Sequence, residues 1–282
     1  MTRFELTDEC IDFASEQYGA VKLHRIRIIE DHRRAKAGTL GGFVYKKENI
    51  KDDGIVLGDA IIADDAVIKG TVLEHARVFG EALVEKDAVV KGYACVHDNA
   101  CIIDSAMVTD HARIYENAKV SGEACVFNYA TAYMNAMIMD RARICGNARI
   151  KGTAIVCDYA YIGDNTTIQK NSFIMGNSII MGECVVSGST LNNVNIRNKQ
   201  LLTGGSWNTT PTIIYFDFGE VGFYDNETIH YNDFAMKIDE WEELFIDYSR
   251  KSNMSEKEFN VVHMAIQTVL TIEKFITNEE NL

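Results

Sequence analysis

Proline is nearly absent from this chain of 282 residues, since it occurs once, at Pro211. A Pro-rich linker is therefore excluded. No apolar run reaches the roughly 18 residues that a membrane-spanning helix needs, so we expect no membrane partner. The opening stretch MTRFELTDEC lacks the apolar core of a secretory signal, and we expect a cytoplasmic protein.

Closely spaced cysteine pairs are also missing. The chain has seven cysteines but no C-x-x-C motif. Zinc ligands usually come as such pairs, so we expect no metal site and interpret the cysteines as small apolar residues in a reducing compartment. Phosphate-loop, zinc-protease and serine-hydrolase motifs are absent as well, and we therefore expect no cofactor.

The chain has an excess of acidic residues, and it is unevenly spread. Residues 1–53 hold ten basic and ten acidic side chains. Residues 54–190 hold eleven basic and sixteen acidic ones, for a charge of −5, and residues 191–282 hold seven and fifteen, for −8. Such a chain does not favour nucleic acid unless a local basic patch offsets the repulsion of phosphates.

A repeat of six residues dominates the middle of the chain. Alanine recurs at every sixth position from Ala76 to Ala160, and the same small position continues to Thr190. Two residues after each small position comes Val or Ile, from Val72 to Val186, with Ala132 as the one exception. An earlier stretch has the same period out of phase, so one step near IKGTVLEHA is shortened.

A period of six fits no amphipathic helix, whose apolar face recurs at three and four residues. A branched residue two after a small one fits a short strand with alternate side chains inward. The Gly, Asn and Asp residues between these pairs suit tight corners. The repeat therefore predicts a mainly β fold, a single-stranded parallel β-helix. Three hexads would form one coil of about 18 residues, giving seven to eight coils over residues 54–190.

Outward residues that lie 18 apart should then stack into three faces of consistent character. The first face is basic and aromatic, and it is a candidate for binding a polyanion or stacking on bases, with an ordinary solvated surface as the alternative. Its candidate binding residues are Arg77, Arg113, Tyr115 and Arg149. The second and third faces are largely apolar.

The second face carries a strip of apolar side chains from successive coils. Its members are Ile103, Met137, Met139, Ile155, Phe173 and Met175. A monomer rarely leaves so large a patch open to water, so we expect a homo-oligomer, either a trimer or a dimer.

The flanking segments suit caps for the two ends of the coil. Residues 1–53 are expected to form an N-terminal β cap, with VKLHRIRII as a strand and KAGTLGGFV as a turn into the first coil. Residues 191–282 are expected to form a small α+β domain. It would hold a β-meander over 212–231 and helices over 239–251 and 255–278, each opening with a capping box.

With these residues in view, the sequence resembles the hexapeptide-repeat, left-handed β-helix proteins, and among them a YdcK-like group of bacterial and phage proteins with a transferase designation. The resemblance rests on AKAGTLGGFV at 35–44 and on the repeated A-x-V/I-x-G/D-N/D units. It implies the left hand of the coil. It also implies an acyltransferase that uses a histidine base and acetyl-CoA or another acyl-CoA, for which His97, His111 and His75 are the candidates.

The histidines have a plainer interpretation as members of surface ladders, and the coil has no insertion between Val72 and Val186 to cover a substrate. We therefore expect no catalytic residue. The favoured hypothesis is a rigid binding or assembly module, phage-borne or prophage-borne, that contacts a host protein. The C-terminal helices, with Trp241 and Phe245 one turn apart, are a further candidate contact surface.

Overall fold

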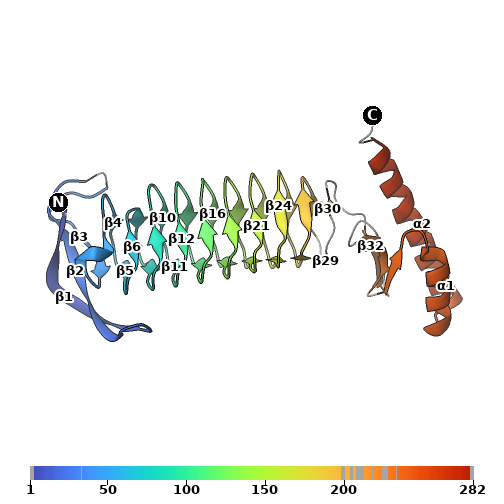
Figure 1. The fold of residues 1–282 in the computed structure, drawn as a ribbon, viewed down its shortest axis with the longest axis horizontal. Helices are drawn as coiled ribbons and strands as arrows, with labels where there is room; N and C mark the ends of the chain where they lie inside the picture. Colours follow the sequence, from blue (N-terminus) through green and yellow to red (C-terminus); the bar gives the residue numbers. More distant parts are fainter. Residues whose placement is uncertain are drawn as a thin grey trace.

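The computed structural model describes residues 3–32, 34–197, 201–203, 206–207, 213–216, 219–223, 228–232 and 234–279. Its centre is a straight stack of triangular coils, with a β-hairpin at one end and a small sheet with two helices beyond the other (Figure 1). The stack is a parallel β-solenoid, as the repeat predicts. No helix in the described part of the chain is long and apolar enough to span a membrane.

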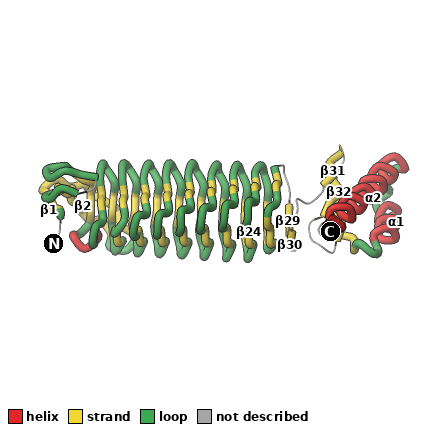
Figure 2. Tube along the Cα trace, turned by 90° about the horizontal axis from the view of Figure 1, so that it is seen from above, coloured by secondary structure: helices red, strands yellow, loops and turns green. Residues whose placement is uncertain are grey.

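Each side of the solenoid is a parallel sheet of very short strands, and Figure 2 shows the coils following one another at even spacing. The first face holds β5 (Ile61–Ile62), β8 (Arg77–Val78), β11 (Cys95–Val96), β14 (Arg113–Ile114), β17 (Thr131–Ala132), β20 (Arg149–Ile150), β23 (Thr167–Gln169), β26 (Val185–Ser187) and β29 (Leu201–Thr203). The second face holds β6 (Val67–Ile68), β9 (Leu83–Val84), β12 (Cys101–Ile102), β15 (Lys119–Val120), β18 (Met137–Ile138), β21 (Ile155–Val156), β24 (Phe173–Met175), β27 (Thr190–Asn192) and β30 (Ser206–Trp207). The third face holds β4 (Ile55–Val56), β7 (Thr71–Val72), β10 (Val89–Val90), β13 (Met107–Val108), β16 (Cys125–Val126), β19 (Arg143–Ile144), β22 (Tyr161–Ile162), β25 (Ile179–Ile180) and β28 (Asn195–Ile196).

The core is the inside of the coil. The alanines of the small position and the branched residues two places later are fully buried, as Ala142 and Ile144 illustrate. At two polar small positions the hydroxyl is satisfied locally, since Ser172 donates to the carbonyl of Gln169 at 2.7 Å and Ser178 to that of Met175 at 2.6 Å. The buried hydroxyls of Thr166 and Ser189 have no hydrogen-bond partner within the described residues. The alternation of inward and outward side chains thus follows the hexad along the whole stack.

Each corner contains a residue in the left-handed backbone region, which explains the Gly, Asn and Asp between strands. The carboxylate of Asp110 accepts a hydrogen bond from the backbone N–H of Asn128, one coil further on, at 3.0 Å. Gly146 occupies the next corner of the same column with φ of 64°. A Cβ there would lie 2.6 Å from the backbone nitrogen of Asp164, so this corner needs glycine.

The coil is longer than the hexad count predicts. Each of the second and third faces has nine strands, and the stacking continues past residue 190 to β30. The shortened early step is confirmed, since Ile68 and Val72 are successive inward residues and Val56 pairs with Val72. The assignment of Thr190 to the small position is wrong. Ser189 is buried there, because the last coils are shorter than 18 residues and Ile174 pairs with Leu191.

The N-terminal cap contains a strand that the sequence did not predict, β1 (Phe4–Ser15). It pairs antiparallel with β2 (Gly19–Ile28), and β2 pairs with β3 (Leu40–Val44), which joins the first face through β5. A short 3₁₀ helix, η1 (Lys47–Asn49), leads into the first coil. The hairpin therefore extends the first face into one continuous sheet of 12 strands.

The C-terminal unit has a four-stranded antiparallel sheet and two helices. The strands are β31 (Ile213–Phe216), β32 (Gly219–Phe223), β33 (Thr228–Tyr231) and β34 (Phe234–Lys237), the last of which the meander prediction lacked. The helices are α1 (Trp241–Lys251) and α2 (Glu256–Glu279). Parts of the predicted meander, such as residues 224–227, lie outside the described residues.

Only one of the two predicted capping boxes is present. The hydroxyl of Ser255 accepts a bond from the N–H of Glu258 at 3.3 Å, and the Glu258 carboxylate accepts one from the N–H of Ser255 at 2.9 Å. The box predicted at Asp239 is wrong, because α1 begins at Trp241 with Glu240 as its N-cap and without a side-chain cap bond.

Candidate functional site

The first face presents three columns of outward side chains along the rod. The central column runs through the strands in parallel register, so that Arg77, Cys95, Arg113, Thr131 and Arg149 follow one another one coil apart. Arginine therefore alternates with a smaller residue at every coil. Neighbouring coils lie about 4.8 Å apart, so successive arginines are about 9.6 Å apart.

A column of stacked rings, the corner ladder, lies on one side of the arginines. The ring centroids of its members are 4.9, 5.1 and 4.9 Å apart and their planes are nearly parallel. The corner ladder consists of His75, Tyr93, His111 and Tyr129. All four side chains are exposed.

A second column, the strand ladder, lies on the other side. Its ring centroids are 4.9, 5.1 and 5.0 Å apart, with interplanar angles of 4°. The strand ladder consists of Phe79, His97, Tyr115 and Tyr133. Phe13 of β1 packs on its first ring at 6.0 Å. These rings are partly buried, whereas the rings of the corner ladder are exposed.

Inside both ladders the ring faces are occupied by the neighbouring rings. The last rings, Tyr129 and Tyr133, each have a ring contact on one face only within the described residues. Only the edges of the rings, which carry the positive end of the aromatic quadrupole, point outward along the groove. Base stacking needs an open ring face, so the internal rings offer no platform for it, and the expectation that this face stacks on bases stays a prediction that rests on the end rings. The outward ring edges add instead to the attraction that the arginines exert on an anion.

The three arginines of the central column are exposed, and within the described residues their guanidinium groups form no ion pair or side-chain hydrogen bond. Arg25 shows the contrast, because it is held by Glu9 at 2.7 Å and by Asp59 at 3.2 Å. No acidic residue occupies the three columns between the coil of Arg77 and that of Arg149.

The positive charge of the column reaches its neighbours. Burial raises the pKa of the Cys95 thiol, while the charges of Arg113 and Arg77 on either side oppose that rise. Burial likewise raises the pKa of Tyr115, against the opposing charges of Arg113 and Arg149. The nearby charges of Asp98 and Glu116 also raise the pKa of the thiol and the phenol, respectively. Both groups are therefore neutral at physiological pH.

The N-terminal end of this groove is a hollow of about 540 Å³. Apolar side chains of the cap close it, namely Ile11 of β1, Phe43 of β3 and Ile61 of β5. Arg77, Arg113 and the ring of Tyr93 line its open part, together with Asp59, whose carboxylate pairs with Arg25 at 3.2 Å. Sequence reasoning found the arginines and Tyr115 but missed the closed end and Tyr129. The 18-residue spacing from His111 contains the signal for Tyr129, whereas nothing in the local sequence indicates where β1 packs.

The three histidines proposed for acyl transfer lie in the ladders, as the plainer interpretation predicts. His97 is sandwiched between Phe79 and Tyr115, its Nδ1 lies 3.2 Å from Asp98, and its Nε2 is buried. A general base must reach the proton of its substrate, and neither nitrogen of this imidazole is free to do so, since Nε2 is buried and Nδ1 lies beside Asp98. His75 has an exposed edge and lines the hollow at the N-terminal end of the groove, with its Nδ1 3.9 Å from Asp59. His111 is exposed on the corner ladder.

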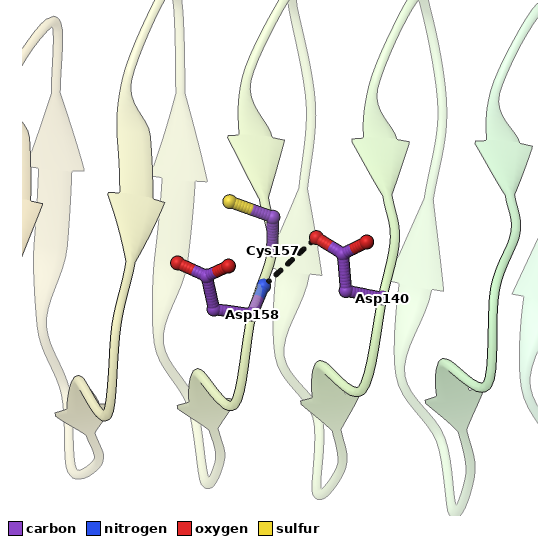
Figure 3. A group of neighbouring side chains, drawn as sticks. All are labelled: Asp140, Cys157 and Asp158. Carbon is purple, nitrogen blue, oxygen red and sulfur yellow. Dashed lines mark hydrogen bonds between the residues drawn. The ribbon is translucent and has the colours of Figure 1, made fainter.

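A group of two carboxylates and a thiol on the coil has ligand atoms within 4.8 Å of one another, namely Asp140, Cys157 and Asp158 (Figure 3). Both carboxylates serve as corner caps. Asp140 accepts from the N–H of Asp158 at 3.2 Å, and Asp158 accepts from the N–H of Gly176 at 2.8 Å. Burial raises the pKa of the Cys157 thiol to about 11, and the nearby charges of Asp158 and Asp140 act in the same direction. This protonated thiol is a poor metal ligand.

The predicted apolar strip lies on the second face, where all six side chains point outward and are half-buried. Lys119 and Ser121 interrupt it between the coils of Ile103 and Met139. The C-terminal helices lie beyond the end of the rod and leave this face uncovered (Figure 1).

The expectation for Phe245 as a contact residue is wrong. Its side chain is fully buried and its ring lies 6.0 Å from that of Tyr231 and 5.3 Å from that of Phe259. It forms the core between the small sheet and the two helices. Trp241, one turn earlier, is partly exposed and stays available as a contact residue.

Comparison with known proteins supports the repeat. Residues 142–158 match the family model described as the YdcK beta solenoid repeat, a stretch shorter than one coil. A search of curated proteins found no match. The resemblance inferred from the hexads is thus confirmed for the fold and for one repeat: the chain is a parallel β-solenoid, and its residues 142–158 are similar to the YdcK beta solenoid repeat.

Proposed function

We propose that the chain is a rigid binding module and that the groove of the first face binds an anionic partner. The observation that carries this proposal is the column of Arg77, Arg113 and Arg149, which are exposed and unpaired within the described residues. Arg77 and Arg113 stand between the two ladders of stacked rings, and Arg149 lies one coil beyond the last rings, Tyr129 and Tyr133. Unpaired guanidinium groups in one line offer bidentate contacts to carboxylates or phosphates.

Rigidity adds to the binding. Backbone N–H groups of one coil bond to carbonyls of the next throughout the first face, as Arg113 does with Ala130 at 3.0 Å. The ring ladders hold the walls in place as well. A partner would therefore meet side chains that are already positioned, which lowers the entropy lost on binding.

Acyl transfer, the alternative hypothesis, gains no support from the geometry. The rings of all three candidate histidines are stacked in ladders, and the coil advances by six residues at each step from Val72 to Val186. A loop that would cover an acyl-CoA has no place in these coils.

We further propose that copies of the chain associate through the apolar strip of the second face, which lies on another side of the rod from the arginines. The two surfaces would then act independently: one would assemble the protein and the other would bind its partner.

Binding of poly-L-glutamate, measured by fluorescence anisotropy at several salt concentrations, tests the groove. We expect binding that weakens as salt rises. The Arg113→Gln variant should bind about tenfold more weakly, since a charge-assisted hydrogen bond is worth about 1.5–3 kcal/mol. The matched control is Arg143→Gln, an exposed arginine on the third face. Equal loss in both variants would overturn the assignment to the first face.

A further inference from the structure

We infer that the partner of this groove is a protein segment in the polyproline II conformation with an acidic residue at every third position. The inference rests on the proposed function and adds the chemical class of the partner. It combines three observations: the spacing of the arginines, the aromatic walls, and the occupied faces of the rings.

The spacing is the first observation. Arg77, Arg113 and Arg149 are separated by two coils each, which is about 9.6 Å. A polyproline II helix has three residues per turn and rises 3.1 Å per residue, so side chains three apart lie on one edge about 9.3 Å apart. Over the two intervals the mismatch is only about 0.6 Å, which a flexible arginine side chain absorbs.

Other extended or helical segments fit less well. In a β-strand, side chains on one face recur every second residue, about 6.8 Å apart, and do not match the arginines. In an α-helix, side chains seven positions apart lie on one face about 10.5 Å apart, a mismatch of about 1.8 Å over the two intervals. The strands β8, β11, β14, β17 and β20 are each paired on both sides, so this face offers no free edge to which a strand could add.

The walls provide the second observation. Polyproline II segments characteristically dock into grooves lined by aromatic side chains, because the helix is preformed and its backbone carbonyls are free. The exposed Tyr93 and Tyr129 place phenol groups along one wall, where they can donate to such carbonyls. At the closed end, Ile11 and Phe43 offer an apolar contact to a prolyl ring.

The third observation separates a protein segment from single-stranded nucleic acid. Recognition of unpaired bases relies on open aromatic faces. In this groove the internal rings of both ladders, such as His111 and Tyr115, have a ring on each side at about 5 Å. An acidic, proline-rich segment needs only the arginines and the ring edges.

A pair of peptides of equal composition tests the inference on the wild-type protein. One has the repeat Glu-Pro-Pro and is long enough to reach all three arginines, and the other holds the same residues with the glutamates clustered at one end. We expect the periodic peptide to bind about tenfold or more tightly than the clustered one, since it engages at least one further arginine.

A charge-preserving swap tests the spacing itself. The double variant Arg113→Thr/Thr131→Arg keeps the composition of the central column but spaces the arginines three coils and one coil apart. It should bind the periodic peptide about tenfold more weakly than wild type, because one arginine falls out of register. Its affinity for poly-L-glutamate should stay within about twofold, since that probe reports charge alone. Thermal unfolding of the variant checks its fold.

The outcomes are distinct. If poly-L-glutamate binds but the two peptides bind equally, the polyproline II inference is overturned and the anion-binding function stands. If neither the polymer nor the peptides bind, the anion-binding function and the polyproline II inference are both overturned. Tighter binding of oligo-deoxythymidylate than of the periodic peptide would also overturn the inference, since it would identify a nucleic-acid groove.

Discussion

At the scale of the residue, the small position of each hexad is set by the carbonyl of the next coil. Where the chain has glycine at this position, the available space is less than a methyl group. A Cβ on Gly54 would lie 2.2 Å from the carbonyl oxygen of Ile68, and one on Gly70 would lie 2.7 Å from that of Ala88. Most other steps hold a fully buried alanine, and side chains no larger than those of Thr166, Cys184 and Val194 take the position in the last coils.

Enlarging one alanine tests this limit. Ala142 is fully buried, so the Ala142→Leu variant should overpack the corner and lower the free energy of unfolding by about 1–3 kcal/mol. The neighbouring Arg143 points outward, and the Arg143→Leu variant should change the free energy of unfolding by less than about 0.5 kcal/mol. Thermal or urea unfolding of both variants measures the difference. Equal destabilisation would contradict the inward and outward assignment.

The buried thiol of Cys157 makes a prediction about pH. Its pKa rises from 9.0 to about 11 in the folded chain, so the unfolded chain loses this proton first as pH increases. Stability should therefore fall between about pH 9 and 11. In Cys157→Ala this fall should be shallower, whereas replacing the exposed Cys10 by Ala should leave it unchanged. Parallel curves for wild type and Cys157→Ala would contradict the assignment of the fall to this thiol.

At the scale of the element, the uninterrupted coil bears on catalysis. From Val72 to Val186 no residue is inserted between strands, and all three candidate histidines belong to ladders. We predict that acetyl-CoA does not bind to the protein in calorimetry. Micromolar binding that disappears in His111→Ala or His97→Ala would refute this and support acyl transfer.

The coil was predictable because its contacts occur at a fixed sequence offset. Residue 77 meets residue 95 for the same reason that residue 95 meets residue 113, so the pattern itself contains the pairing. The arginine column and both ladders follow from the same offset. The arginines, the three histidines and Tyr115 were therefore predictable from the sequence, whereas the lack of ion pairs at Arg77, Arg113 and Arg149 was not.

The caps were less predictable, because their packing depends on parts distant in sequence. β1 runs for 12 residues, yet its role depends on a hairpin that folds onto the first face. Phe245 and Trp241 share one helical turn, and only the sheet beneath the helices decides that one is core and the other partly exposed. The small position of the last coil likewise falls on Ser189 instead of the predicted Thr190, because the coils become shorter near the end of the stack.

At the scale of the whole molecule, the strip on the second face predicts a homo-oligomer. Several half-buried apolar side chains line up along one side of a straight rod, and parallel rods can meet there without distorting their coils. We expect a trimer or a dimer in light scattering. The Met139→Asp variant should be monomeric with an unchanged melting profile. A monomeric wild type would refute the strip as an interface.

The two caps lie at opposite ends of the rod, and between them each coil touches only the coils before and after it (Figure 1). The length of the rod can therefore change by whole coils, when the sequence of one coil is duplicated or deleted. Because arginine and a smaller residue alternate from coil to coil, the effect depends on whether an even or an odd number of coils is added. Duplicating two adjacent coils would extend the charge pattern unbroken, whereas duplicating one would set two arginines or two small residues side by side. We expect length variants of this rod to differ by even numbers of coils within the segment from Arg77 to Arg149.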